Sequence, residues 1–101
     1  LAGSSRIRGA AKSGRTDPYS QSVIAALLRA KPPPFALRGS VMVSFEIGPG
    51  GSLKYVKMLN SSGNTAMDQE AINAIRRARF DPPPPHLTPD DLTYIIHYIF
   101  E

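Results

Sequence analysis

The hydrophobic positions of this chain change their period along its length, and each period predicts an element. Between residues 39 and 47 apolar side chains alternate with polar or flexible ones, and the apolar set is Val41, Val43, Phe45 and Ile47. A period of two built from β-branched and aromatic residues predicts a half-buried strand. Proline and glycine at residues 49–51 predict a tight turn. A second strand is expected over residues 52–60, which makes the pair a hairpin.

The second strand does not keep one hydrophobic phase. Val56 and Met58 are expected to face the core, whereas Leu53 is out of phase with them. A bulge near Lys54 and Tyr55 would place all three apolar residues on one face, because a bulge inserts one extra residue into the alternation.

Apolar residues recur at helical spacing in a segment that begins near residue 18. Asp17 and Pro18 supply an N-cap and a first helical residue. The helix should end before the prolines at 32–34, since proline disfavours the helical state of the residue before it. Its apolar stripe consists of Val23, Ile24, Leu27 and Leu28.

A second helix is predicted after the turn at residues 61–64. Thr65 and Asp68 have the spacing of a capping box, with Asp in place of the usual Glu or Gln. Four prolines at 82–85 then impose an extended connection. The apolar stripe of this helix is Met67, Ala71, Ala74, Ile75 and Ala78.

The last segment, residues 92–100, is almost wholly apolar and aromatic and predicts a third strand. The element order is therefore αββαβ. A helical crossover is right-handed and joins parallel strands, so the third strand should run parallel to the second. This places the first strand between them, in the order 2-1-3. We predict an α+β two-layer sandwich, with a three-stranded antiparallel-rich sheet and two helices on one face.

Residues 1–17 have a different composition from the rest of the chain. They are mostly Gly, Ser, Ala and basic residues without periodicity, which indicates the flexible end of a linker. The domain is then expected to span residues 18–101. The formal net charge is +4, and the basic residues of the first segment are interpreted as a solvated tail rather than a nucleic-acid arm. The chain begins at Leu1, so we expect it to be part of a longer protein.

Reactive side chains are not arranged for catalysis or metal binding. The absence of cysteine excludes disulfides and cysteine-ligated metals. His86 and His97 each lack a second histidine or a carboxylate at ligand spacing. Ser61 and Ser62 fall in a turn without a nucleophile elbow. We therefore expect no enzyme activity, no cofactor and no metal.

The last strand is expected to lie at the edge of the sheet, and it lacks the usual protection of an edge. Residues 93–100 contain no Lys and no Pro, the residues that commonly blunt such strands. Three outcomes are open: the chain's own N-terminal segment covers the strand, a second copy pairs with it, or a partner adds a strand to it.

The order and spacing of these patterns resemble the TonB C-terminal domain family. Together they make chance similarity improbable, and they cover residues 19–101. The similarity runs through residues 39–47, residues 51–56, the Ser61-Ser62-Gly63 motif, residues 67–71 and residues 74–82.

The resemblance implies a non-enzymatic, partner-binding domain in the bacterial periplasm. TonB-like proteins are anchored in the inner membrane by an upstream helix, which an ExbB–ExbD complex energises. Their C-terminal domain accepts the TonB box of an outer-membrane transporter as an added strand, as in siderophore uptake. Carried over to this chain, the pairing strand lies within the last strand, and arginines of the second helix add charge. The partner-binding residues are then Thr93, Tyr94, Ile95, Ile96, His97, Tyr98, Arg76, Arg77 and Arg79.

The chain departs from the family pattern ahead of the first hairpin strand. A Tyr-Pro pair and a Gln are frequent there in the family, whereas this chain has Pro34-Phe35-Ala36 after a long helix. Such an upstream helix resembles TolA, so the alternative is a TolA-like envelope-integrity domain that binds Tol–Pal partners. A weak homodimer through the last strand is also plausible. Nucleic-acid binding through the basic residues is a third and weaker alternative, and an enzyme is the least favoured.

Overall fold

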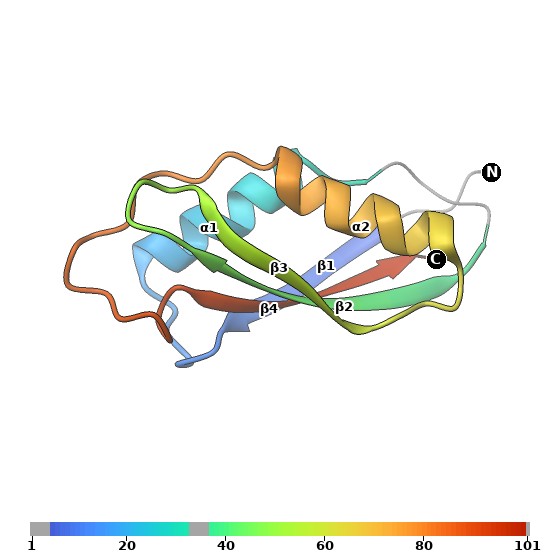
Figure 1. Ribbon diagram of the computed structural model, residues 1–101, viewed down its shortest axis with the longest axis horizontal. Coiled ribbons are helices and arrows are strands. Elements are labelled where there is room, and N and C mark those ends of the chain that lie inside the picture. Colours follow the sequence, from blue (N-terminus) through green and yellow to red (C-terminus); the bar gives the residue numbers. More distant parts are fainter. Residues whose placement is uncertain (1–4, 33–36, 101) are drawn as a thin grey trace.

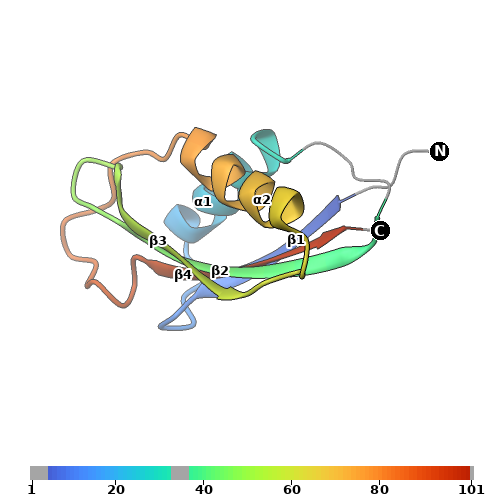
Figure 2. The same cartoon turned by 45° about the vertical axis from the view of Figure 1, so that its right-hand side comes forward.

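The computed structural model describes residues 5–32 and 37–100. The four strands of this described part form one sheet in the order β1-β4-β2-β3, and every neighbouring pair is antiparallel. Both helices lie on the same face of that sheet, so the fold has two layers (Figure 1, Figure 2). The elements in chain order are β1 (Ser5–Ala11), α1 (Pro18–Arg29), β2 (Gly39–Ile47), β3 (Leu53–Asn60), α2 (Thr65–Arg77) and β4 (Thr93–Phe100).

The α+β class is confirmed, and the three predicted strands keep their expected order inside the larger sheet. β2 lies between β3 and β4 and is antiparallel to both. β3 and β4 therefore run in the same direction, which is the arrangement that a helical crossover through α2 produces.

The predicted number of strands is wrong, because the sheet has a fourth strand. β1 comes from the segment that we expected to be a flexible linker end, and it pairs with β4 along seven residues. β4 is consequently an inner strand and not an edge. The first of the three outcomes considered for β4 is the one observed. An uncovered strand presents a row of unpaired backbone groups, and β1 satisfies that row even though its own side chains carry no hydrophobic alternation.

The irregularity that we predicted in the second hairpin strand is confirmed. Tyr55 faces Glu46 and Leu53 faces Ile47, so Lys54 is an extra residue without an opposite partner. This shift turns Leu53 toward the same face as Val56 and Met58, and all three pack against the core.

Asp17 caps α1 as predicted. Its Oδ1 accepts a hydrogen bond from the backbone N–H of Ser20 at 3.0 Å, and its Oδ2 accepts one from the Arg15 guanidinium at 2.8 Å. The hydrogen bond from Ser20 and then that from Arg15 lower the pKa of Asp17 to about 2. The helix ends at Arg29. The 34–36 stretch, where the chain departs from the family pattern, lies outside the described residues.

The predicted cap of α2 is displaced by one residue. Asn64, and not Thr65, is the N-cap, and its Oδ1 accepts from the backbone N–H of Met67 at 3.0 Å. Asp68 does reach back toward the start of the helix, where it accepts from the backbone N–H of Ser62 at 2.8 Å. Asn is as good an N-cap as Thr or better, so the earlier residue takes the position.

The core lies between the sheet and the two helices. Its strand members are the inward residues of β2 and β4 and Ala11 of β1. The stripe predicted for α2 packs there, and so do Val23, Ile24 and Leu27 of the stripe predicted for α1. Leu28, which we also expected to face the core, is 49% exposed.

Gly51 fixes the hairpin against the connection that follows α2. Its φ is +89°, and a Cβ there would lie 2.6 Å from the carbonyl oxygen of Phe80. Only glycine fits this close approach without strain.

Candidate functional site

β4 is paired on both sides along the residues that we expected to bind a partner. Residues 94–98 face β2 on one side and β1 on the other, and Thr93 faces β2. The antiparallel register places Gly9 opposite Ile96 and Arg8 opposite His97. The strand that resembles the partner-accepting strand of the family is therefore present at full length, and it already holds an added strand that belongs to the same chain.

Side chains of β4 alternate between the core and the open face of the sheet. Tyr94, Ile96 and Tyr98 point toward the helices and are fully buried. Ile95 is 39% exposed and His97 is half-buried, since both lie on the face that the helices leave uncovered. His97 thus has the place expected for a residue on the less buried face of a strand.

The two tyrosines of β4 differ in how their hydroxyls are satisfied. The Tyr94 hydroxyl shares a buried hydrogen bond of 3.0 Å with Ser20 Oγ on α1. The Tyr98 hydroxyl is buried without a hydrogen-bond partner among the described residues. Burial raises the pKa of both tyrosines, because desolvation disfavours a phenolate.

Beyond its pairing with β4, β1 is held at its C-terminal end by contacts near residue 12. The backbone N–H of Lys12 donates to the Thr93 carbonyl at 2.7 Å. The Lys12 ammonium lies 3.6 Å from Asp90, and both side chains are largely exposed. Between β1 and α1 lies an apolar groove of about 320 Å³, lined by residues that include Ala11 and Leu28. The inner face of β1 is therefore only lightly packed against the helix.

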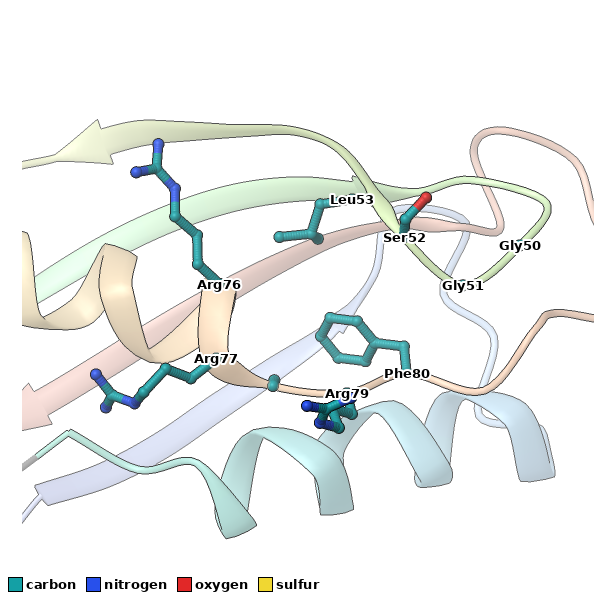
Figure 3. Close-up of a pocket in the computed structure, with 9 residues that line it drawn as sticks. Gly50, Gly51, Ser52, Leu53, Arg76, Arg77, Arg79 and Phe80 are labelled. Carbon is teal, nitrogen blue, oxygen red and sulfur yellow. The ribbon is translucent and has the colours of Figure 1, made fainter.

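The three arginines of the expected site lie elsewhere, around a basin at the C-terminal end of α2. Arg76, Arg77 and Arg79 line it together with Phe80 and the hairpin turn at residues 50–53, and its volume is about 830 Å³. The arginine side chains leave the chain in different directions (Figure 3). No residue of β4 lines this basin. The expected partner-binding residues thus form two groups, a strand and a basic basin, and of the arginines Arg77 is near enough to Tyr98 to oppose the rise in the pKa of its hydroxyl.

Sequence reasoning did not identify β1 as part of the site. The residues that face β4 from β1 and point inward are Ile7, Gly9 and Ala11. Two of them are too small to give a hydrophobic period. The missing protection of residues 93–100 was the signal that some strand must cover them, but it did not show which segment would do so.

Within the described ranges, no three histidine, aspartate or glutamate side chains gather closely enough to hold a metal ion. In the same part of the chain, neither helix has the length and apolar character needed to cross a membrane.

Comparison with known proteins identifies a family and a similar fold. Residues 34–101 match the family model described as Gram-negative bacterial TonB protein C-terminal. A solved structure with a similar fold is the solution structure of TolAIII bound to a peptide derived from the N-terminus of TolB. Its TM-score is 0.65 at 23% sequence identity, over 86% of this chain and 76% of that chain. No match was found among the curated proteins.

Proposed function

Because this chain belongs to the family of Gram-negative bacterial TonB protein C-terminal domains, we propose that it is a periplasmic module that binds an extended segment of an outer-membrane transporter, the TonB box, by strand addition to β4. The segment would pair with residues 93–98. Through the remainder of a longer protein, anchored in the inner membrane and coupled to ExbB–ExbD, this contact transmits proton-motive energy to the transporter.

The observation that carries this proposal is the character of β4 itself. It is an eight-residue strand without Lys or Pro, and its inward side chains are fully buried. Its outer side is covered by β1, a strand that is small or basic apart from Ile7 and that borders an apolar groove beside α1. Strand addition needs a rigid row of backbone groups on a stable sheet, and β4 offers such a row whenever its outer neighbour is absent.

The basic basin gives the partner a second contact. Arg76 and Arg79 are exposed there, so acidic side chains that flank the added strand would be attracted to this end of the molecule. The arginines then contribute to orientation and to the association rate, while the backbone of β4 supplies the hydrogen bonds.

A TolA-like role is the second candidate, and the similar fold of TolAIII favours it. That structure holds a peptide from the N-terminus of TolB. The upstream helix α1 packs on the same sheet and is tied to β4 by the bond between Ser20 and Tyr94. In this role the domain would bind a Tol–Pal partner and maintain envelope integrity.

The test is a titration of the isotope-labelled chain with two peptides, a transporter TonB box and a TolB N-terminal segment, with a scrambled peptide as control. We expect amide shifts in residues 93–100 and in β1 with one of the two peptides, and none with the scrambled one. A net stabilisation of about 0.5–1.5 kcal/mol for each backbone hydrogen bond, less the cost of ordering the peptide, predicts a Kd in the micromolar range or weaker. Shifts that miss residues 93–100 with both peptides contradict strand addition at β4.

A further inference from the structure

β1 occupies the place that a partner's strand would take. It runs antiparallel to β4 in a continuous register from Ser5 opposite Phe100 to Ala11 opposite Tyr94. A second strand cannot use the same backbone groups of β4, because each N–H and each C=O is already paired on that side. Any segment that pairs with residues 93–98 must therefore replace β1.

The fit of β1 shows which side chains this position accepts. Ile7 faces Tyr98 and packs against the core, and Ala11 faces Tyr94 and is buried. Between them, a Cβ at Gly9 would clash with Ile96 Cδ1 and lie 3.0 Å from the Ile95 carbonyl oxygen. Ile96 Cδ1 is the tip of a side chain, but the Ile95 carbonyl oxygen belongs to the backbone, so a Cβ at residue 9 would also press on the main chain of β4. The position opposite Ile96 thus takes glycine, and its neighbours take one apolar and one small residue.

β1 is also suited to being displaced. The apolar groove between β1 and α1 leaves its inner face partly unpacked, and the ion pair between Lys12 and Asp90 is exposed. Segments with few buried apolar contacts open at low free-energy cost. β1 contributes Ala11 to the core and packs Ile7 against it, whereas nearly all other core members come from β2, β4 and the helices.

We propose that β1 is an intramolecular stand-in for the partner strand: it protects β4 until a partner segment with an apolar residue, a glycine opposite Ile96 and a small residue opposite Tyr94 displaces it. This inference rests on the proposed function, which it deepens by naming the competitor and the chemistry of the partner. The apparent affinity for a partner is then reduced by the fraction of molecules in which β1 is docked.

The first test locks β1 in place with an engineered disulfide. Arg8 and His97 lie opposite each other. The Lys12 N–H donates to the Thr93 carbonyl, so these two residues form a hydrogen-bonded pair. Hydrogen-bonded and non-hydrogen-bonded pairs alternate along antiparallel strands, so Arg8 and His97 form another hydrogen-bonded pair, with Cα atoms about 5.5 Å apart. This separation suits a disulfide. The chain has no other cysteine. In the Arg8→Cys/His97→Cys variant we expect oxidation to weaken binding of the partner peptide at least about tenfold and reduction to restore it. The single variants, treated with the same oxidant, measure the effect of losing either side chain.

The second test loosens β1 and needs no partner. Gly9→Val should undock β1 through the contact with Ile96, whereas Ala10→Val, on the exposed face of the same strand, should not. A synthetic peptide with the sequence of residues 5–12 is then added in trans. We expect it to bind the Gly9→Val chain about tenfold more tightly than the wild type or Ala10→Val chain. The same peptide with valine in place of its glycine should not bind. Amide spectra of β2, β3 and α2 report that the rest of the fold is intact.

The outcomes separate the two proposals. If the partner peptide binds the oxidised and the reduced Arg8→Cys/His97→Cys variant equally, β1 does not compete with the partner strand, and the proposed function is unaffected. If the partner peptides bind no form of the chain, the proposed function fails, and the trans peptide still decides whether β1 is exchangeable. Equal binding of the trans peptide to the wild-type and Gly9→Val chains, or binding to neither, contradicts the inference.

Discussion

At the scale of single residues, the two tyrosines of β4 present a direct contrast in buried polar groups. Both are fully buried on the same face. The Tyr94 hydroxyl is bonded to Ser20, while the Tyr98 hydroxyl has no partner among the described residues. A buried hydroxyl without a hydrogen bond is destabilising, and a bonded one leaves its partner unsatisfied when it is removed.

We therefore predict opposite effects of removing the two hydroxyls. Tyr98→Phe should leave the free energy of unfolding unchanged or raise it by up to about 1 kcal/mol, whereas Tyr94→Phe should lower it by about 1 kcal/mol. Urea denaturation of both variants and the wild type at neutral pH measures the difference. A loss in Tyr98→Phe as large as that in Tyr94→Phe would show that the Tyr98 hydroxyl has a partner.

The cap of α1 predicts a pH dependence of stability. The pKa of Asp17 is lowered to about 2 by the hydrogen bonds from Ser20 and Arg15, below the value of about 3.9 for an unfolded chain. The stabilisation by its carboxylate is therefore complete above pH 4 and is lost as the pH falls from 4 toward 2. Asp17→Asn keeps the capping oxygen and removes the charge. The wild type should be more stable than this variant at pH 6, and denaturation curves should converge at pH 2. A constant difference across this range contradicts the assignment.

At the scale of elements, the start of α2 depends on one residue. Asn64 accepts a hydrogen bond from Met67 N–H, and the neighbouring Thr65 is exposed. Asn64→Ala should lower the free energy of unfolding by about 1 kcal/mol, and Thr65→Ala should change it by less than about 0.5 kcal/mol. Urea denaturation of the two variants side by side is the measurement. Equal losses would indicate that Thr65 shares the capping role.

The elements that were predictable from the sequence are those whose conformation is determined by neighbouring residues. β2 alternates Val41, Val43 and Phe45 with polar or flexible residues, and α1 begins with an Asp-Pro pair, so local patterns were sufficient for both. β1 contains Gly9, Ala10 and Ala11. These residues form no hydrophobic alternation, and their intrinsic preference for strands is low. Its strand conformation comes from pairing with β4, more than 80 residues later in the chain. Such long-range pairing is invisible to a reading of adjacent residues.

At the scale of the whole molecule, the expected partner-binding residues are divided between two places. Residues 93–98 lie in the interior of the sheet, and the three arginines lie at the end of α2. The missing edge protection and the family resemblance led us to expect both groups, but not their separation, because it depends on how α2 crosses the sheet. In the proposed function, the strand would supply backbone pairing and the basin would supply charge that acts over a longer range.

Charge reversal in the basin should therefore slow association with an acidic partner segment without altering the fold. Arg79→Glu changes an exposed basin residue, and Lys57→Glu makes the same change in charge on exposed β3, away from the basin. At low salt we expect Arg79→Glu to reduce the association rate about three- to tenfold and Lys57→Glu to have a clearly smaller effect. At 0.5 M salt the difference should largely disappear, because screening shortens the range of the field. Stopped-flow fluorescence with a labelled peptide measures both rates. If the two variants slow association equally, only the net charge of +4 matters, and the basin has no specific part in recognition.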